Sequence, residues 1–295
     1  MEKLKILFSG WKECNLEQYK EAYAHFGGCT LTHPNIISFL NKHLDGQFCF
    51  YIKKTGSAIK GAFFSCENNK LVEEMQDRYP ISYDEIIFPV AEDAKLFLPV
   101  KSKRLSPIHK NNFINASFNS LLSKRKICLI KDSFSYKTRR NRSNEINKFK
   151  RAGGEIRPSS EFRAEDLVDI YIDLYQKRWN FSHSEEQRKS LLEMYTELRE
   201  HIFGNVLLIN GKPCAYDFVL WADSPKWVSF DAINGGYDPE YAHLSVGSIL
   251  MWANIQEAKA LCQQRDKTLR YSLGNPTLEY KNRWCETLPL GRVLF

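Results

Sequence analysis

The sequence predicts an α/β (α+β) fold made of two similar units, each with a mixed, mostly antiparallel sheet flanked by helices. Three observations support this fold class. The chain has 295 residues, more than the roughly 100–200 residues of one domain. Each half contains a pair of helical segments, and each pair precedes a β-hairpin, which indicates an internal duplication. We expect an N-terminal unit over 1–134 and a C-terminal unit over 135–295.

The first half begins with helical patterns. The spacing predicts a helix over 16–26 that ends at Gly27-Gly28, and a second apolar-periodic segment over 36–40. His33 precedes Pro34, so its backbone should be extended, and a structural role is expected for its side chain. Apolar runs on either side of a glycine-containing turn predict a hairpin over 47–66.

Three further apolar runs predict strands in the first half. They cover 86–90, 96–100 and 126–130. Pro89 and Pro99 confine the first two to sheet edges or strand ends, because proline cannot donate a ladder hydrogen bond. The run over 126–130 is expected to close the first half.

The second half repeats the pattern with clearer signals. A polar helix is expected over 143–151, an amphipathic helix over 167–179, and a helix from Ser184 to Gly204. Gln187 completes a capping box with Ser184.

A second hairpin follows over 205–221, with Asn210-Gly211 as its turn. The pattern then predicts a strand over 227–232, a glycine-containing loop at 234–236, a helix from Val246 and a strand over 269–273.

The net charge of +7 is concentrated in one segment. Between Leu121 and Arg151 there are eleven Lys or Arg residues against Asp132 and Glu145. Such a segment suits a polyanion, whether nucleic acid, an anionic membrane surface or a phosphorylated cofactor, or it is a solvated helix face. The predicted polyanion or membrane patch consists of Arg139, Arg140, Arg142, Lys148, Lys150 and Arg151.

Eight scattered cysteines lack metal-ligand spacing, which favours reduced core thiols and no metal. No apolar run reaches the ~18 residues of a spanning helix, and the start is too short for a signal-peptide core. We therefore expect a cytoplasmic protein, with any membrane association peripheral.

Several segments of the second half, over about 135–290, resemble the GNAT acyltransferase fold. They are most similar to the branch containing the FemAB-type aminoacyltransferases and their acyl-CoA-dependent relatives. The matching segments are Arg139-Arg140-Asn141-Arg142, Phe149 to Gly154, Tyr175 to Trp179, Ile209 to Ala215, Gly236 to Glu240, Ser245 to Leu250 and Glu279 to Trp284. Members of this branch pack two GNAT-like units together, which matches the predicted duplication.

Over its full length the chain also resembles the Mig family, the products of a macrophage-inducible bacterial gene. This resemblance includes Gly10-Trp11, Phe26-Gly27-Gly28 and Thr32-His33-Pro34. It implies a role in virulence and in resistance to cationic antimicrobial peptides, at the inner face of the cytoplasmic membrane. Members have also been described as transcription regulators.

The GNAT resemblance implies a site for an acyl donor such as acyl-CoA. In that fold the donor's pyrophosphate lies on backbone N–H groups at a helix start. The matching residues here are Leu244, Ser245, Val246, Gly247 and Ser248. The family pattern has two glycines in this loop, whereas this chain keeps only Gly247; alternatively, Ser245 is an N-cap and Gly247 a packing residue.

Acyl transfer to an amine needs a base and a group that stabilises the oxyanion. Asp231 is the first candidate base, because it ends the strand before the loop. Asp217 is a second, and its pKa is expected to rise if it is buried. Tyr280 and Lys281 could supply a hydroxyl and a cation, and His243 could titrate near neutral pH. A structural role remains an alternative for each.

Three functions stay open on the sequence. The first is an acyltransferase that modifies an amine or hydroxyl of an envelope component, with acyl-CoA or aminoacyl-tRNA as donor and an unidentified acceptor. The second is a GNAT-like protein that binds a ligand or membrane without catalysis. The third is a DNA-binding regulator, disfavoured because the segment between the helices around 145–151 and 167–179 is too long for a helix-turn-helix. The sequence has no P-loop, dinucleotide fingerprint, nucleophile elbow or H-E-x-x-H motif.

Overall fold

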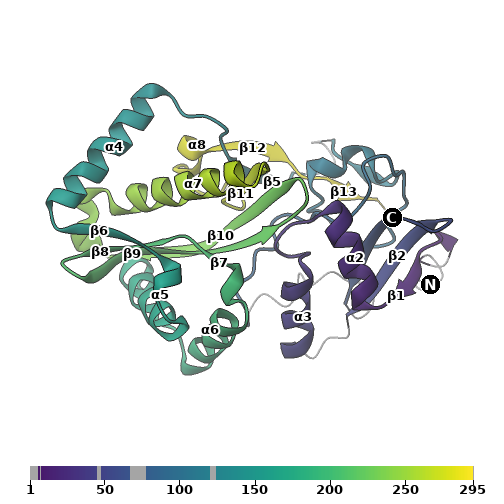
Figure 1. Ribbon diagram of the computed structural model, residues 1–295, viewed down its shortest axis with the longest axis horizontal. Coiled ribbons are helices and arrows are strands. Elements are labelled where there is room, and N and C mark those ends of the chain that lie inside the picture. Colours follow the sequence, from purple (N-terminus) through teal and green to yellow (C-terminus); the bar gives the residue numbers. More distant parts are fainter. Residues whose placement is uncertain (1–5, 7, 45–47, 67–77, 120–123, 295) are drawn as a thin grey trace.

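The computed structural model describes the chain except residues 1–5, 7, 45–47, 67–77, 120–123 and 295. The sequence-based expectations for the first residues, for the start of the basic segment at 121–123 and for Phe295 therefore lie outside the described residues. The described part contains a three-stranded sheet, an eight-stranded sheet and a two-stranded pair (Figure 1).

The N-terminal part packs two helices against the small sheet. Strands β1 (Lys12–Cys14), β2 (Cys49–Thr55) and β3 (Ala58–Ser65) pair in that order, and β2 and β3 form the expected hairpin. Helix α2 (Leu16–Phe26) begins at a capping box and ends at Gly27, whose φ of 77° suits glycine. Helix α3 (Pro34–His43) begins after His33, which is extended and caps the helix through its side chain.

Two strands predicted for the first half are wrong. Residues 86–90 and 96–100 form only isolated bridges, such as Gly61 with Val90 and Leu96 with Phe113. Their apolar side chains are buried, because these segments cross the core as irregular chain. The short element η3 (Pro107–Asn111) and strand β4 (Ala116–Ser117) follow, and β4 pairs with β13 (Arg292–Val293).

The large sheet has the strand order β12-β5-β11-β10-β9-β8-β6. Its members are β5 (Lys126–Ile130), β6 (Gly154–Pro158), β7 (Ile202–Phe203), β8 (Asn205–Ile209), β9 (Lys212–Asp223), β10 (Trp227–Tyr237), β11 (Thr268–Ser272) and β12 (Cys285–Pro289). Strand β5 was expected to close the first half, but it pairs with β12 over five residues and so completes the large sheet. The division of the chain at 134/135 stays a prediction.

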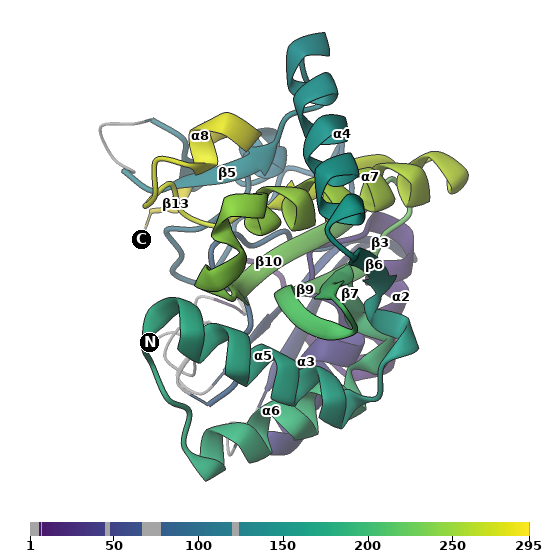
Figure 2. The same ribbon diagram turned by 90° about the vertical axis from the view of Figure 1, so that its left-hand side faces the viewer.

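Helices cover both faces of the large sheet. In Figure 2, α5 (Ala164–Trp179) and α6 (Glu185–Glu197) lie below the sheet, whereas α4 (Tyr136–Arg151), α7 (Val246–Gln264) and α8 (Lys281–Trp284) lie above it. The capping box at Ser184 and Gln187 is present as predicted. Helix α6 ends at Glu197, not at Gly204, because η5 (Arg199–His201) and β7 follow it.

Strand β10 is longer than predicted. Residues 234–236 were expected to form a loop, but they continue the strand beside β9 after a bulge near Ile233. The glycines allow neighbouring parts of the chain to lie close to the β10 backbone at this point. A Cβ at Gly235 would overlap the Asp217 carboxylate, and one at Gly236 would overlap the backbone of Leu174 in α5. The Gly235-Gly236 pair thus marks close packing.

The parallel pairing of β10 with β11 stops early. It runs from Trp227 opposite Thr268 to Asp231 opposite Ser272. Beyond Asp231, β10 pairs only with β9. The two parallel strands therefore separate, and the sheet opens on the side covered by α4, α7 and α8.

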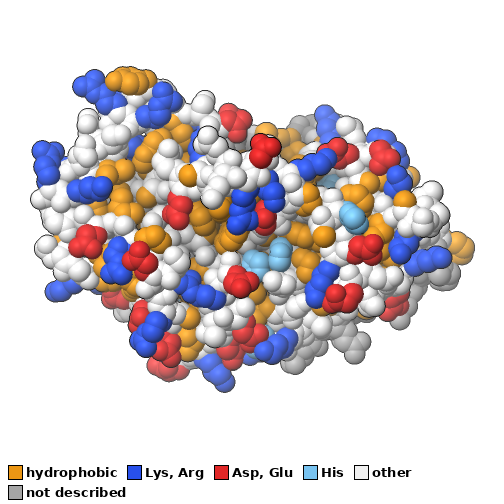
Figure 3. Space-filling view, viewed as in Figure 1, with side chains coloured by type: hydrophobic (Ala, Val, Ile, Leu, Met, Phe, Trp, Pro, Cys, Tyr) orange, Lys and Arg blue, Asp and Glu red, His pale blue; other side chains and the backbone are white. Residues whose placement is uncertain are grey.

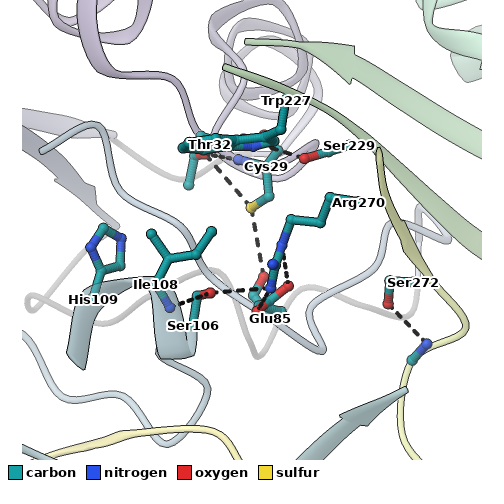
Figure 4. Close-up of polar contacts among 12 residues, drawn as sticks. Cys29, Thr32, Glu85, Ser106, Ile108, His109, Trp227, Ser229, Arg270 and Ser272 are labelled. Atoms are coloured by element: carbon teal, nitrogen blue, oxygen red, sulfur yellow. Dashed lines mark hydrogen bonds and ion pairs between the residues drawn. The ribbon is translucent and has the colours of Figure 1, made fainter. Parts of the chain in front are cut away.

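Buried polar contacts join the N-terminal part to the large sheet (Figure 4). Arg270 of β11 forms an ion pair with Glu85 and donates to the Ser106 hydroxyl at 3.2 Å. The Trp227 indole N–H donates to the Gly28 carbonyl at 2.8 Å. Because a buried charge is costly without its partner, the Arg270–Glu85 pair fixes how the two parts meet.

Asp231 lies at this junction. The Thr30 hydroxyl donates to its carboxylate. Burial raises the pKa of Asp231 to about 7, and the negative charges of Glu85 and Asp84 add to the rise. The folded protein therefore binds a proton at Asp231 more tightly than the unfolded chain does.

Replacing Gly236 by alanine should destabilise the fold by about 1–3 kcal/mol, because the new methyl group would overlap the α5 backbone. Gly247→Ala is the matched control. Its Cβ would lie 3.6 Å from Tyr237, an ordinary contact, so stability should change by less than about 1 kcal/mol. Urea unfolding measures both, and equal stabilities would contradict the proposed packing.

Asp231→Asn should flatten the dependence of stability on pH. Because the folded pKa of Asp231 is raised, its favourable contribution is complete below pH about 4 and is lost as the pH rises through about 7. The variant should gain on the order of 1–3 kcal/mol over wild type between about pH 5 and pH 8. Thermal unfolding across this range tests it, and parallel curves for the two proteins would refute it.

Candidate functional site

A cavity of about 720 Å³ lies where β10 and β11 separate. It is enclosed by α4, the start of α7, α8, the end of α5 and the sheet. Its volume suits a small-molecule ligand. The lining residues are Thr138, Asn141, Arg142, Arg178, Asp217, Gly236, Tyr237, Ala242, Ser245, Val246, Gly247, Ser248, Leu250, Met251, Tyr280, Arg283 and Trp284.

Asp217 supplies the carboxylate that lines this cavity. It lies in β9 opposite Gly235, and the missing Cβ of that glycine leaves room for the carboxyl group. Burial raises the pKa of Asp217 to about 6, and the positive charge of Arg178 offsets part of the rise. The group is therefore largely ionised at neutral pH and can still accept a proton.

Arg178 and Tyr280 reach the cavity from different helices. The Arg178 guanidinium, in the last turn of α5, donates to the Gly235 carbonyl at 3.2 Å and lies over the Tyr237 ring at 5.0 Å. Tyr280 stands at the start of α8. Burial raises its pKa, the Asp217 charge adds to the rise, and Arg178 opposes it. A carboxylate, a guanidinium and a phenol thus meet at one end of the cavity.

The start of α7 forms another wall. Ser245 is left-handed, with φ of 61°, and its side chain makes no capping hydrogen bond. The Ser248 amide donates to the Ser245 carbonyl at 2.9 Å, whereas the Val246 and Gly247 amides come first in the helix and lack an intrahelical acceptor, which suits an anion. Gly247 is exposed, and a Cβ there would have room. Ser245 therefore does not cap the helix with its side chain, and Gly247 is not required by tight packing.

Leu244 and Lys281 do not line the cavity. Leu244 is buried in the core beneath α7. The Lys281 ammonium donates to the carbonyls of Leu273 and Asn275, at 2.5 and 2.7 Å, and so ties α8 to the end of β11. His243 is exposed outside the cavity, with Nδ1 3.0 Å from the Glu240 carbonyl.

Asp231 and Asp217 point to opposite faces of the sheet. Asp231 pairs with Leu220, whose side chain packs in the core on the α5–α6 side. Val219, two residues from Asp217 and therefore on the same face, packs in the core beneath α7. The structure therefore brings Asp217 and Tyr280 together with the α7 start, and it places Asp231 at the junction between the two parts.

The structure divides the predicted basic patch. Arg142 lines the cavity. Arg139 donates to the Phe134 carbonyl at 2.8 Å, and Lys148 to the His243 carbonyl at 3.2 Å. Arg140 and Lys150 are exposed, and so is Arg151, which donates to its own helix. Figure 3 shows basic side chains along the edge of the molecule formed by α4.

Sequence reasoning did not assign Arg178 and Arg283 to the site. Both stand inside segments that carried the resemblance, Tyr175 to Trp179 and Glu279 to Trp284. Each arginine reaches the cavity through the way α5 and α8 pack, which no local pattern in the sequence indicates.

All eight cysteines are free, and six of them are buried. Within the part of the chain that the structure describes, no group of three or more potential ligands could hold a metal ion. No described helix is both long and apolar enough to cross a membrane.

Comparison with solved structures shows the fold. FemX covers 97% of this chain and 97% of its own, with 8% identity and a TM-score of 0.57. A tandem GNAT protein from the clavulanic acid biosynthesis pathway covers 96% and 95%, with 10% identity and a TM-score of 0.46. L-PGS from Bacillus licheniformis covers 96% and 93%, with 11% identity and a TM-score of 0.47. The predicted fold class, a tandem GNAT-like α/β protein, is confirmed.

A comparison with curated proteins finds no significant match. The sequence model of the Mig-14 family, in contrast, matches residues 33–293, which include both parts of the molecule and every residue that lines the cavity. The expected resemblance is confirmed, and the chain belongs to the Mig-14 family.

Proposed function

We propose that this protein is an acyl- or aminoacyltransferase whose reaction takes place in the cavity beside Asp217. The observation that carries the proposal is the meeting of Asp217, Arg178 and Tyr280 next to the open start of α7. An acyl transfer needs an anion site for the phosphate of the donor, a base and an acid, and this cavity offers a candidate for each.

The donor's phosphate lies against the amides of Val246 and Gly247, and its acyl carbonyl points toward Asp217. The donor is acyl-CoA or an aminoacyl-tRNA, since both carry phosphate on the same molecule as the activated acyl group, joined to it through pantetheine in acyl-CoA and through the terminal ribose in aminoacyl-tRNA. The open start of α7 favours phosphate in either case.

Asp217 takes the proton from the attacking amine or hydroxyl. The new bond forms between that nucleophile and the acyl carbon, and the bond from the acyl carbon to the leaving sulfur or oxygen breaks. Tyr280 gives its proton to the leaving group, and Arg178 holds the two side chains in place. In this scheme the base is Asp217, whereas Asp231 and Lys281 act on the fold.

The acceptor belongs to the bacterial envelope in this proposal, and its modification contributes to resistance to cationic antimicrobial peptides. This biological setting is what the resemblance to the Mig family implies. The protein acts from the cytoplasm, at the inner face of the cytoplasmic membrane.

Membrane binding is a second candidate function, which does not require catalysis. The specific observation is the exposed tip of α4, where Tyr136 is 72% exposed beside the exposed side chains of Lys137, Arg139 and Arg140. An aromatic ring flanked by cations suits the surface of an anionic bilayer. DNA reading by a helix-turn-helix gains no support, because strand β6 separates α4 from α5.

Binding of the donor should raise the melting temperature in proportion to RT ln(1 + [L]/Kd). We expect a shift with coenzyme A, acetyl-CoA, a long-chain acyl-CoA or an aminoacyl-tRNA. Gly247→Trp should abolish the shift by filling the cavity, whereas Gly247→Ala should keep it. No shift with any of these four ligands would rule out the transferase proposal.

The rate of acyl transfer should rise with pH through about 6 and then level off, because Asp217 must lose its proton to act as base. Asp217→Asn should lower the plateau about 100- to 10,000-fold and remove the pH step. Single-turnover kinetics measure both. Asp166→Asn, which changes an exposed carboxylate paired with Arg163, is the control. An unchanged pH step in Asp217→Asn would show that another group is the base.

Replacing Arg139 and Arg140 by serine should weaken binding to vesicles that contain phosphatidylglycerol, and added salt should weaken the wild type in the same way. Co-sedimentation measures this. Binding that is insensitive to both changes would exclude the α4 tip as the membrane contact.

A further inference from the structure

Helix α4 lies across the cavity from α7. Thr138, Asn141 and Arg142 of α4 line one wall, and Ser245 to Ser248 line another. Lys148 fastens the far end of α4 to the His243 carbonyl, close to the start of α7. Any ligand at the start of α7 therefore has α4 nearby.

Arg142 is the basic residue of α4 that lines the cavity, and its side chain is only 19% exposed. Its guanidinium lies 5.5 Å from the centre of the Trp284 ring, and its Nη1 is 2.6 Å from Glu145 Oε2. This contact is an ion pair between residues one helical turn apart. Arg142 Nε, Arg142 Nη1 and Glu145 Oε2 are buried and make no hydrogen bond within the described residues, although the last two form this ion pair.

Such a cluster is costly unless something completes it. The Arg142 charge is paired with Glu145, but its Nε is a buried donor without an acceptor, which costs about 1–3 kcal/mol. Native proteins keep few such groups, and an ion or ligand is a common reason for those that remain. A guanidinium on a cavity wall fits phosphate best, because its planar fork matches two phosphate oxygens.

Arg283 of α8 brings a second guanidinium to the same cavity. The carboxylate that lines the cavity, Asp217, stands near Arg178, Tyr280 and the close approach to Gly235. The part of the cavity walled by α4, α8 and the α7 start therefore carries positive charge, and the Asp217 end carries the reactive groups.

We infer that Arg142 and Arg283 bind the phosphate of the donor from the side opposite α7. Phosphate recognition is then shared between the α7 amides and two arginines on α4 and α8, which makes these arginines determinants of donor specificity. Glu145 holds Arg142 when the cavity is empty, and the phosphate of the ligand replaces Glu145 as its partner. The inference rests on the proposed function, because it places the donor in the same cavity.

The test compares two phosphate-bearing probes, coenzyme A and an RNA minihelix ending in CCA, by isothermal titration calorimetry. At least one should bind the wild type, and the one that binds identifies the source of the phosphate. Arg142→Gln should weaken that binding by at least about tenfold, and Arg142→Lys should restore it only in part. Arg151→Gln, an exposed arginine on the same helix, should bind within about twofold of wild type.

Two checks separate a ligand contact from a structural effect. The number of ions released on binding, measured from the salt dependence, should fall in Arg142→Gln. Arg283→Gln provides a second variant at an exposed position if Arg142→Gln does not fold. If a probe binds and these arginine variants bind it as tightly as wild type, the inference fails while the proposed function stands. If neither probe binds the wild type, both fail together.

Discussion

The candidate site exists because the parallel pairing of β10 and β11 stops at Asp231 and Ser272. Up to that point the two strands are joined by a regular ladder. Beyond it, β10 follows β9, β11 leads toward α8, and the sheet opens between them. The start of α7 and the side chains of Asp217 and Tyr280 all face this opening. A ladder continued by a few residues would close the cavity.

Two glycines allow β10 to continue beyond that point. Gly236 lets α5 pack against the strand, which delivers Arg178 to the cavity, and Gly235 leaves room for the Asp217 carboxyl. The same short segment therefore controls packing on one face of the sheet and chemistry on the other. At the other end of β10, the Arg270–Glu85 pair and the Trp227–Gly28 hydrogen bond attach the N-terminal part.

Much of the fold could be predicted from local signals. The Asn210-Gly211 turn, the Ser184–Gln187 capping box and the Gly27 helix end all determine structure within a few residues, and all three are observed. The pairing of β5 with β12 could not be predicted, because its nearest partners, Ile130 and Cys285, are far apart in the chain and carry no local signal of their partnership. The irregular structure of 86–90 could not be predicted either, because its apolar residues are buried without pairing as a regular strand.

The candidate site could likewise be predicted only where its residues carry a local signal in the sequence. The α7 start and Tyr280 were proposed from segments that resemble the GNAT fold and Asp217 from a predicted strand, and the structure brings all three to one cavity. Asp231 was ranked above Asp217 because it ends the predicted strand before the loop, but its side chain points to the other face of the sheet. Arg178 and Arg283 reach the cavity only through the tertiary arrangement of α5 and α8.

Hydrogen–deuterium exchange with the bound donor tests most directly the central claim, that the donor binds in the cavity beside Asp217. We expect protection at the α7 start, in α4 around Arg142 and at Asp217. Protection instead at the second cavity, about 670 Å³ between Phe26, Phe88 and Trp227, would contradict this account.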